Sequence, residues 1–398
     1  MNDLPRYCTR ALSQLLLRTR ALLVLSGPPR VGKSTACRSL ASSLLSWDSA
    51  EDRRVLLLGA RAVAAHLGRE RLRMRNAVLG FDDLCRYRKW RDLLQDLRTH
   101  CGASSRLIAT GDAAPDPRQR NCAGDRGRHL HLRLHPWSVG ECVRREHTCA
   151  GIQSPGTIQD EDWAALLEHG GFPEPFLRRD PAFTREWQLA RPAPLAAGEL
   201  AGVAPLHDPI GLQTLARRLA ECSSRPLIYS TYSRELGVTV ETVTRWVQLL
   251  ARLHYGFCVR PWFARVSKAL RREPKWFLRD WSGVTDPLER RRTFVACHLL
   301  KAVQGWSDLG LGRFGLHYVR DKLGREVDFL VTRHDRPWFL VAVDADDRHE
   351  EWLARFQRAT RARQAFHLML DEPFMNVDCF NSSGPVVVSA RTLLSQLP

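Results

Sequence analysis

A short segment between an apolar run and an amphipathic stretch has the residue types and spacing of a phosphate-binding loop. Residues 21–26 read ALLVLS, and the chain continues as Gly27-Pro28-Pro29-Arg30-Val31-Gly32-Lys33-Ser34-Thr35, which fits G-x-x-x-x-G-K-[ST]. Glycines let backbone N–H groups close around phosphate oxygens, and a helix beginning here adds the positive end of its dipole. We therefore expect Gly27 to Thr35 to bind ATP, with Lys33 neutralising phosphate charge and Ser34 ligating Mg²⁺. The alternative is a structural glycine turn.

Two carboxylates follow the apolar stretch at residues 78–81, which reads VLGF. An ATPase needs an acid at the end of a neighbouring strand to hold the magnesium shell, and we assign this role to Asp82. Asp83 stands where a glutamate often polarises the attacking water, and its side chain is one methylene shorter, so we expect slow or geometry-dependent hydrolysis. The alternative is that both acids begin a solvated loop.

Thr110 ends a third apolar stretch, LIAT at residues 107–110. Its hydroxyl would face the γ-phosphate if this strand lies between the loop strand and the Asp82 strand. We therefore include Thr110 among the candidate catalytic residues.

The composition indicates a globular protein of two or three domains. The 398 residues are 44% hydrophobic and 26% charged, with a net charge of +17. The charge favours DNA or another polyanion as a partner. The apolar runs fall far short of the ~18 residues that a membrane span needs, so we expect a cytoplasmic protein without a membrane partner.

Alternation of apolar runs with helical segments predicts a parallel α/β sheet at the N-terminus. The expected strands are residues 21–26, 55–58, 77–81, 107–109 and 130–134, and residues 34–45 are expected to be a helix. Residues 212–250 are predicted helical, and further strands are expected at 315–320, 326–332 and 338–343.

In order and spacing, these motifs resemble those of bacterial and archaeal AAA-like P-loop ATPases that carry a C-terminal domain related to restriction endonucleases. The likeness covers most of the chain. It rests on Arg6 before GPPRVGKST, on FDDL and ATGD, on Gly127-Arg128, on the stretch from Leu134 to Glu141, and on Gly170-Gly171-Phe172-Pro173-Glu174. The resemblance implies that Arg128 senses or stabilises γ-phosphate charge, within one chain or across a subunit boundary. The alternative for Arg128 is an ordinary solvated arginine.

Residues 233–246 resemble a helix-turn-helix, with Gly237 at the turn and Thr239 as the cap of the second helix. Such modules serve in packing as well as in DNA contact, and both readings stay open. The predicted buried face comprises Val240, Val243, Val247 and Leu250. The predicted outward face comprises Glu241, Thr242, Arg245, Gln248 and Arg252.

Members of the resembled family carry a helix glutamate, then Glu-Val-Asp-Phe on one strand and Glu-x-Lys on the next. Glu326-Val327-Asp328-Phe329 is present, but Ala342 and Asp344 stand where the second glutamate and the lysine are expected, and Arg292 lies near the position of the helix glutamate. Ala342 cannot ligate a metal and Asp344 cannot supply a cation. We therefore expect a nuclease-like fold without nuclease chemistry.

Histidines at 129, 131 and 135 recur at the period of a strand, and an exposed strand face is a simpler interpretation than a metal site. A set of basic residues forms either a polyanion surface or solvated helix faces. The set comprises arginines 69, 71, 73 and 75 together with Arg86, Arg88, Lys89 and Arg91.

The expected fold class is α/β, with a P-loop ATPase domain at 1–180, a helical and winged-helix-like domain at 181–265 and a degenerate nuclease-like domain at 266–398. The leading hypothesis is an Mg-ATP-dependent ATPase whose hydrolysis drives conformational change. Two alternatives are a nucleotide-gated scaffold with little hydrolysis and a structure-specific nuclease. An unidentified protein partner and a homo-oligomer are both left open.

Overall fold

Strand β1 (Leu22–Ser26) is buried on both faces, because its side chains alternate between two apolar clusters. Leu22 and Val24 pack on one face of the sheet, and Leu23 and Leu25 pack on the other. This pattern is typical of a strand inside a parallel sheet that helices cover on both sides. The computed structural model describes residues 6–18, 22–68, 77–101, 106–112, 129–144, 151–191, 208–263, 273–344 and 348–398.

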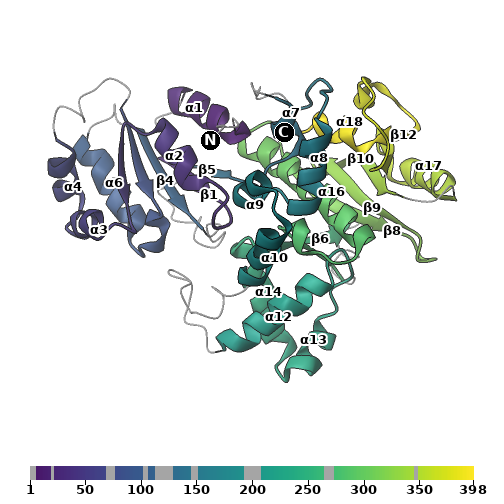
Figure 1. Ribbon diagram of the computed structural model, residues 1–398, viewed down its shortest axis with the longest axis horizontal. Coiled ribbons are helices and arrows are strands. Elements are labelled where there is room, and N and C mark those ends of the chain that lie inside the picture. The colour runs from purple at the N-terminus through teal and green to yellow at the C-terminus, as the bar shows by residue number, and fades with distance from the viewer. Residues whose placement is uncertain are drawn as a thin grey trace.

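The N-terminal lobe is built on a parallel five-stranded sheet of order β2-β3-β4-β1-β5. Its other strands are β2 (Ser43–Ser46), β3 (Val78–Asp82), β4 (Arg106–Gly111) and β5 (His129–Arg133). Its helices are α1 (Tyr7–Arg18), α2 (Lys33–Leu40), α3 (Ala50–Leu57), α4 (Ala60–Leu67), the short η1 (Leu84–Arg86) and α6 (Trp90–Cys101). The predicted α/β class is confirmed, and Figure 1 shows this lobe in purple and blue.

Two predicted elements of this lobe are wrong. Residues 55–57 form the end of α3 and Leu58 follows as its C-cap, so no strand forms here. Ser49 caps the helix by accepting from the backbone N–H of Asp52, and Leu57 and Leu58 are exposed. The helix expected at 34–45 ends at Leu40, and residues 43–46 form β2 beside β3. Pairing with β3 outweighs the helical periodicity of this stretch.

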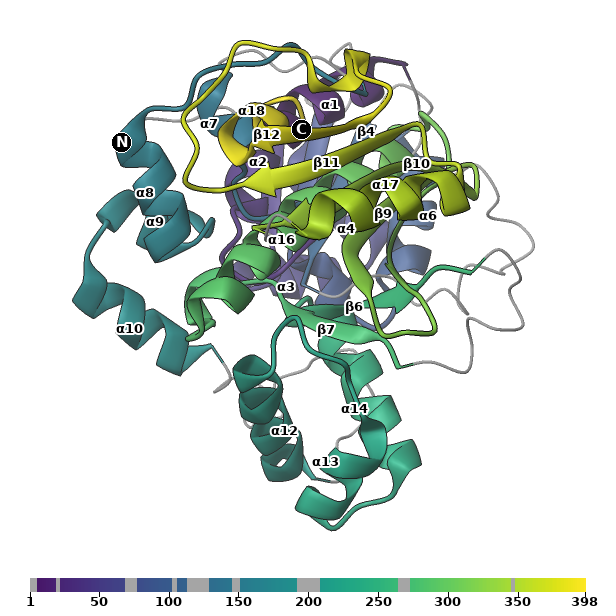
Figure 2. The ribbon, with the colours of Figure 1, turned by 90° about the vertical axis from the view of Figure 1, so that its right-hand side faces the viewer.

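The C-terminal lobe contains a mixed seven-stranded sheet of order β12-β11-β10-β9-β8-β6-β7. Its strands are β6 (Gly256–Pro261), β7 (Lys275–Leu278), β8 (Phe314–Arg320), β9 (Glu326–Arg333), β10 (Arg336–Val343), β11 (Gln364–Met369) and β12 (Pro385–Ser389). The long helix α16 (Pro287–Asp308) and the short α18 (Ala390–Ser395) pack in the main apolar cluster. Helix α17 (Arg348–Thr360) contributes to a second cluster. Figure 2 shows α16 and α17 beside this sheet.

Three helices form a helical module that lies at the bottom of Figure 1 and shares an apolar cluster with β7. They are α12 (Pro209–Glu221), α13 (Tyr229–Leu236) and α14 (Val240–Arg252). Gly237 between α13 and α14 has φ of 64°, and Thr239 accepts from the backbone N–H of Thr242. The predicted turn and cap are thus confirmed. Val240 is 46% exposed and not buried as predicted, because it is the first residue of α14 and lies beyond the packed face.

Helices α7 (Val139–Val143), α8 (Asp160–His169), α9 (Pro173–Arg178), α10 (Pro181–Ala190) and the short turns η3 (Trp281–Gly283) and η4 (Cys379–Asn381) complete the described elements. Trp137, Trp163 and Phe176 pack in the apolar cluster of the C-terminal lobe, and β6 belongs to its sheet. Packing therefore crosses the boundaries drawn at 180 and 265, and the division into three folding units stays a prediction.

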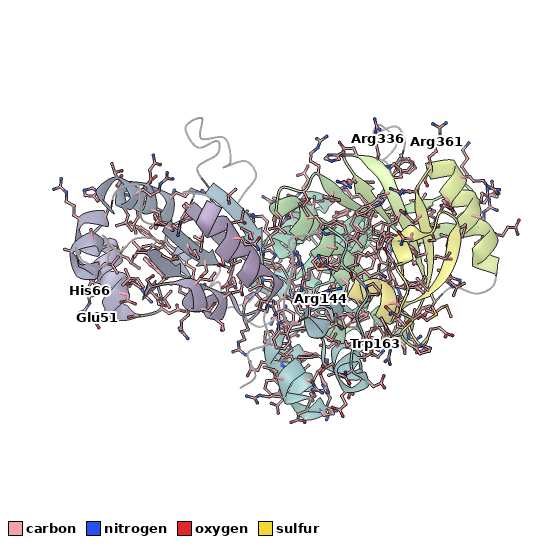
Figure 3. The ribbon with its side chains drawn as sticks, turned by 90° about the horizontal axis from the view of Figure 1, so that it is seen from above. Glu51, His66, Arg144, Trp163, Arg336 and Arg361 are labelled. Carbon is pink, nitrogen blue, oxygen red and sulfur yellow. The ribbon has the colours of Figure 1, made fainter. Side chains whose placement is uncertain are left out.

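Figure 3 shows Glu51 and His66 at the far end of the N-terminal lobe and Arg336 and Arg361 at the outer side of the C-terminal lobe, with Arg144 and Trp163 between them. Arg133 on β5 forms an ion pair with Asp308 at the end of α16, with Nη2 2.5 Å from Oδ1. Among the described helices, none has the length and apolar character that crossing a bilayer requires.

Candidate nucleotide site

The loop between β1 and α2 needs its glycines for two different reasons. A Cβ on Gly27 would lie 2.4 Å from the carbonyl oxygen of Leu134, so the close approach of the segment after β5 excludes a side chain there. Gly32 directly precedes α2 and has φ of 101°, a backbone conformation that residues with a side chain rarely adopt. The loop therefore presents the N-terminus of α2 at the carboxyl end of a central strand, which is where an α/β sheet places an anion site.

Lys33 is the first residue of α2 and is only 5% exposed. Its ammonium donates to the carbonyl oxygens of Gly27 and Pro28, at 3.1 and 2.8 Å, and to Oδ1 of Asp112 at 2.6 Å. The loop carbonyls hold the ammonium inside the loop. This is the position from which a lysine can neutralise phosphate charge.

The remaining loop residues differ in their exposure. Pro28 and Val31 are buried, Pro29, Arg30 and Thr35 are exposed, and Ser34 is half-buried at the second position of α2. Arg30 has φ of 62° and extends to Glu174, with Nη1 3.8 Å from Oε2.

A hydrogen-bonded relay joins the ends of β3 and β4. Strand β4 lies between β1 and β3, as predicted. The hydroxyl of Thr110 donates to Oδ1 of Asp82 at 2.7 Å and accepts from the backbone N–H of Asp83 at 2.8 Å. Thr110 is fully buried and Asp82 is 8% exposed. The relay fixes one oxygen of Asp82 and orients the backbone that carries Asp83.

Asp83 is held in the left-handed region with φ of 51°. Burial, and next the negative charge of Asp112, raise the pKa of Asp83 from 3.8 to about 6, and Lys33 opposes this change. A carboxylate with a pKa near neutrality is suited to general-base chemistry.

The donor set fits a magnesium-bound nucleotide. A buried aspartate and a hydroxyl at the start of α2 are oxygen ligands of the kind that Mg²⁺ prefers when it is shared with phosphates. Asp82 and Ser34 would hold the ion, and the ion would neutralise phosphate charge when bound.

One residue of this site was missed by the sequence reasoning, and one predicted residue is outside the described part of the chain. Asp112 forms the ion pair with Lys33. The sequence could have pointed to it, because Asp112 comes two residues after Thr110 and directly after the same strand. Arg128 lies outside the described residues, as do the arginines at 69, 71, 73 and 75.

The segment Gly170 to Glu174 packs directly on the loop. Phe172 is fully buried in the apolar cluster that contains Val31 and Leu25. A Cβ on Gly171 would lie 2.5 Å from the carbonyl oxygen of Trp137, and the carbonyl oxygen of Gly171 accepts from the backbone N–H of Trp137 at 2.6 Å. The segment thus connects the nucleotide loop to the C-terminal lobe.

In the C-terminal lobe, arginines from α16 neutralise the acids of the predicted nuclease-like site. Nε of Arg292 lies 3.1 Å from Oδ1 of Asp328, and Nη1 of Arg291 lies 2.9 Å from Oδ2 of Asp344. Ala342 is buried. Within the described ranges, no group of three or more histidine, cysteine, aspartate or glutamate residues is arranged to hold a metal ion.

The histidines at 131 and 135 do not form an exposed strand face. His131 is half-buried, and its Nε2 lies 2.7 Å from the hydroxyl of Ser26. His135 is 4% exposed, because β5 ends at Arg133 and the chain turns inward toward Arg279. The expectation of an exposed face is therefore wrong for His135.

The second helix of the helix-turn-helix has a mixed outer face. Glu241, Arg245 and Gln248 are exposed as predicted, whereas Thr242 and Arg252 are half-buried. Val243, Val247 and Leu250 are buried, as predicted, together with Trp246.

Comparison with known protein families supports a P-loop fold for the N-terminal lobe. Residues 19–143 match the family described as an AAA domain, which supports an AAA-like P-loop fold for this part of the chain. Residues 160–285 match a domain of unknown function, DUF8612. No curated protein matches the sequence.

Among solved structures, that of C. elegans PCH-2 matches with 13% identity and a TM-score of 0.25. The match covers 60% of this chain and 66% of that chain.

Proposed function

We propose that the protein is an Mg-ATP-dependent ATPase whose nucleotide state controls how the helical module and the C-terminal lobe are arranged. The observation that carries the proposal is the convergence of Lys33 with the Asp82–Thr110–Asp83 relay at the carboxyl ends of three adjacent strands. Lys33 neutralises phosphate charge, Asp82 and Ser34 hold the ion, and Asp83 orients and polarises the attacking water. Arg128 is proposed to sense the γ-phosphate.

Three contacts support a route from the nucleotide to the rest of the molecule. Arg30 of the loop forms an ion pair with Glu174 of α9, and its guanidinium lies 5.6 Å from the ring centroid of Trp187 on α10. Trp187 in turn donates to Asp280, next to η3, at 2.8 Å. A phosphate that attracts Arg30 would therefore compete with contacts that lead toward the C-terminal lobe.

The test is phosphate release by the full chain with saturating Mg-ATP. We expect turnover that is lost in Lys33→Ala and in Asp82→Asn and kept in Lys322→Ala, a control on an exposed turn. Turnover that persists unchanged in Lys33→Ala would refute the assignment of the site.

A second candidate function is a nucleotide-gated scaffold with little hydrolysis. The ion pair between Lys33 and Asp112 favours it, because this pair engages the phosphate-binding lysine. Tight ATP binding without phosphate release would select the scaffold over the ATPase.

We further propose DNA contact by the outer face of α14, where Arg245 and Gln248 are exposed. Fluorescence anisotropy with duplex DNA should show binding that weakens steeply with salt and is reduced in Arg245→Ala. Arg218→Ala on α12 is the control, because Arg218 is paired with Glu221 and Glu235. Equal losses in both variants would contradict a specific role of α14.

A further inference from the structure

A small cavity lies behind the segment that follows β5. Its volume is about 10 Å³, and its wall comes from two parts of the chain that are far apart in sequence. The segment after β5 contributes His135, Trp137 and Ser138, and the C-terminal lobe contributes Arg279, His298 and Lys301. A cavity of this size has room for one species about the size of a water molecule.

Three residues of the wall hold buried nitrogen atoms without a hydrogen-bond partner in the described structure. They are Nε2 of His135, Nε1 of Trp137 and Nε of Arg279. Their residues are 4%, 6% and 4% exposed, in that order. Unpaired buried polar atoms are costly, so an occupant that satisfies them is expected.

All three nitrogen atoms are hydrogen-bond donors. An indole N–H and a guanidinium N–H can only donate. Nδ1 of His135 lies 2.9 Å from Nη1 of Arg279, and must accept from it. Burial, and next the charge of Arg279, hold the pKa of His135 well below 6.5, so the ring is neutral and its proton is on Nε2.

The surroundings of the cavity carry more positive than negative charge. In the described chain Arg279 has no carboxylate within ion-pair distance, although burial lowers its pKa only to about 10 and it stays protonated at neutral pH. Arg6 and Lys301 both pair with the same carboxylate, that of Glu141, at 3.6 and 2.5 Å. A buried charge without a counter-ion is strongly unfavourable.

A water molecule would not satisfy this site. Water has two lone pairs and its own two protons, so it cannot accept from three donors, and its protons would point at a cationic wall. A monatomic anion accepts from every direction and also supplies the missing negative charge.

We propose that this cavity is a halide site that binds chloride, held by Trp137, His135 and Arg279. The anion joins the segment that leaves the N-terminal sheet to the C-terminal lobe, because its donors come from the segment after β5 and from the segment between β7 and η3. The backbone of Trp137 also donates to Gly171, next to the nucleotide loop. Chloride therefore stabilises the junction across which the nucleotide site contacts the C-terminal lobe.

The test is thermal unfolding of the full chain without nucleotide, at constant ionic strength, with sodium chloride replacing sodium gluconate. Gluconate is too large for the cavity. We expect the Tm to rise saturably with chloride, by about 2 °C or more, and with bromide as well. Bromide in crystals should give an anomalous scattering peak in the cavity.

The informative variant is Trp137→Phe, which removes one donor and keeps an aromatic ring. It should raise the half-saturating chloride concentration by about tenfold or more, because a hydrogen bond to a charged group is lost. Trp276→Phe is the matched control, since Nε1 of Trp276 is also buried without a partner but Trp276 does not line the cavity.

Three results would overturn the proposal. They are equal Tm values in chloride and gluconate, a chloride effect that does not saturate, and equal changes in Trp137→Phe and Trp276→Phe. Because the measurement uses no ATP, failure of the halide site is distinguishable from failure of the ATPase proposal.

Discussion

Nζ of Lys33 lies 2.6 Å from Oδ1 of Asp112, so the phosphate-binding lysine of the loop is paired with an acid from the end of β4. The loop carbonyls of Gly27 and Pro28 take the other two protons of the ammonium. A nucleotide that enters the site must therefore compete with Asp112 for Lys33. The same acid raises the pKa of Asp83, so one side chain acts on both binding and catalysis.

Lys33→Ala should abolish ATP binding or turnover and leave the fold intact. It removes the positive charge that neutralises the β- and γ-phosphates, and it removes no apolar packing. In the wild type, ATP at about 100 times its Kd should add about 2.7 kcal/mol to the free energy of unfolding. Thermal unfolding with and without Mg-ATP measures this difference. An undiminished ATP effect in the variant would count against the site.

Asp112→Asn should tighten ATP binding, because Lys33 no longer has a competing carboxylate. Asp112 is 37% exposed on its side chain, so solvent screens the pair and we expect a gain of up to about fivefold in affinity. Titration calorimetry gives the affinity. Asp335→Asn, which removes an exposed partner of Arg313 far from the loop, is the control and should bind ATP as the wild type does. Weaker binding in Asp112→Asn would mean that the acid positions Lys33 for the nucleotide.

The pH profile of kcat/KM should have an acidic limb near pH 6. The pKa of Asp83 in the folded protein is raised, mainly by burial, so below pH 6 the carboxyl is protonated and cannot polarise water. The rate should fall about tenfold per pH unit on this limb. The contribution of Asp83 to the free energy of unfolding changes in the opposite direction, because the folded state binds this proton more tightly than the unfolded chain does. Above pH 6 the buried charge lowers the free energy of unfolding, and this cost disappears as the pH falls toward 4. Asp112→Asn should move the limb to lower pH, and an unmoved limb would assign it to another group.

Asp83→Glu should raise turnover, because the longer side chain reaches the attacking water more easily. Asp82→Asn should lower turnover by weakening the magnesium shell. Steady-state phosphate release at saturating Mg-ATP measures both changes. If Asp83→Glu reduces turnover sharply while ATP affinity is unchanged, the site is adapted to aspartate and slow hydrolysis is not explained by side-chain length.

The C-terminal lobe should not cleave nucleic acid, because Arg291 and Arg292 neutralise the acids that would hold a metal ion. We expect no Mg²⁺- or Mn²⁺-dependent cleavage of linear, circular or branched DNA. Gel analysis after long incubation is the measurement, and DNA affinity should decrease from low to moderate salt. Metal-dependent cleavage that disappears in Asp328→Ala would make the nuclease the leading hypothesis.

The nucleotide site was predictable because its signals are local. The loop from Gly27 to Ser34 is contiguous, and Asp82 and Thr110 each follow a short apolar strand. Parallel strands bring their carboxyl ends to one edge of a sheet, so residues that end separate strands meet without further information. The helix-turn-helix was predictable for a similar reason, because Gly237 and Thr239 are a local turn and cap.

Local patterns did not predict what pairing and burial decide. Residues 43–45 were predicted as the end of a helix, but they pair with β3 as part of a strand. The apolar run at 55–58 lies at the end of a capped helix, where Leu56 is buried and Leu57 and Leu58 are exposed. His135 lies in a buried turn because Arg279, 144 residues away in the chain, packs against it.

By itself the sequence determined the phosphate loop, the order of strand-end residues that complete it and the loss of the Glu-x-Lys pattern. Only the tertiary structure decided that Asp112 pairs with Lys33, that arginines of α16 neutralise Asp328 and Asp344, and that Arg279 is buried without a carboxylate among the described residues. The physical reason is that an ion pair or a desolvated charge depends on distance and burial, and both are set by how segments far apart in the chain pack together.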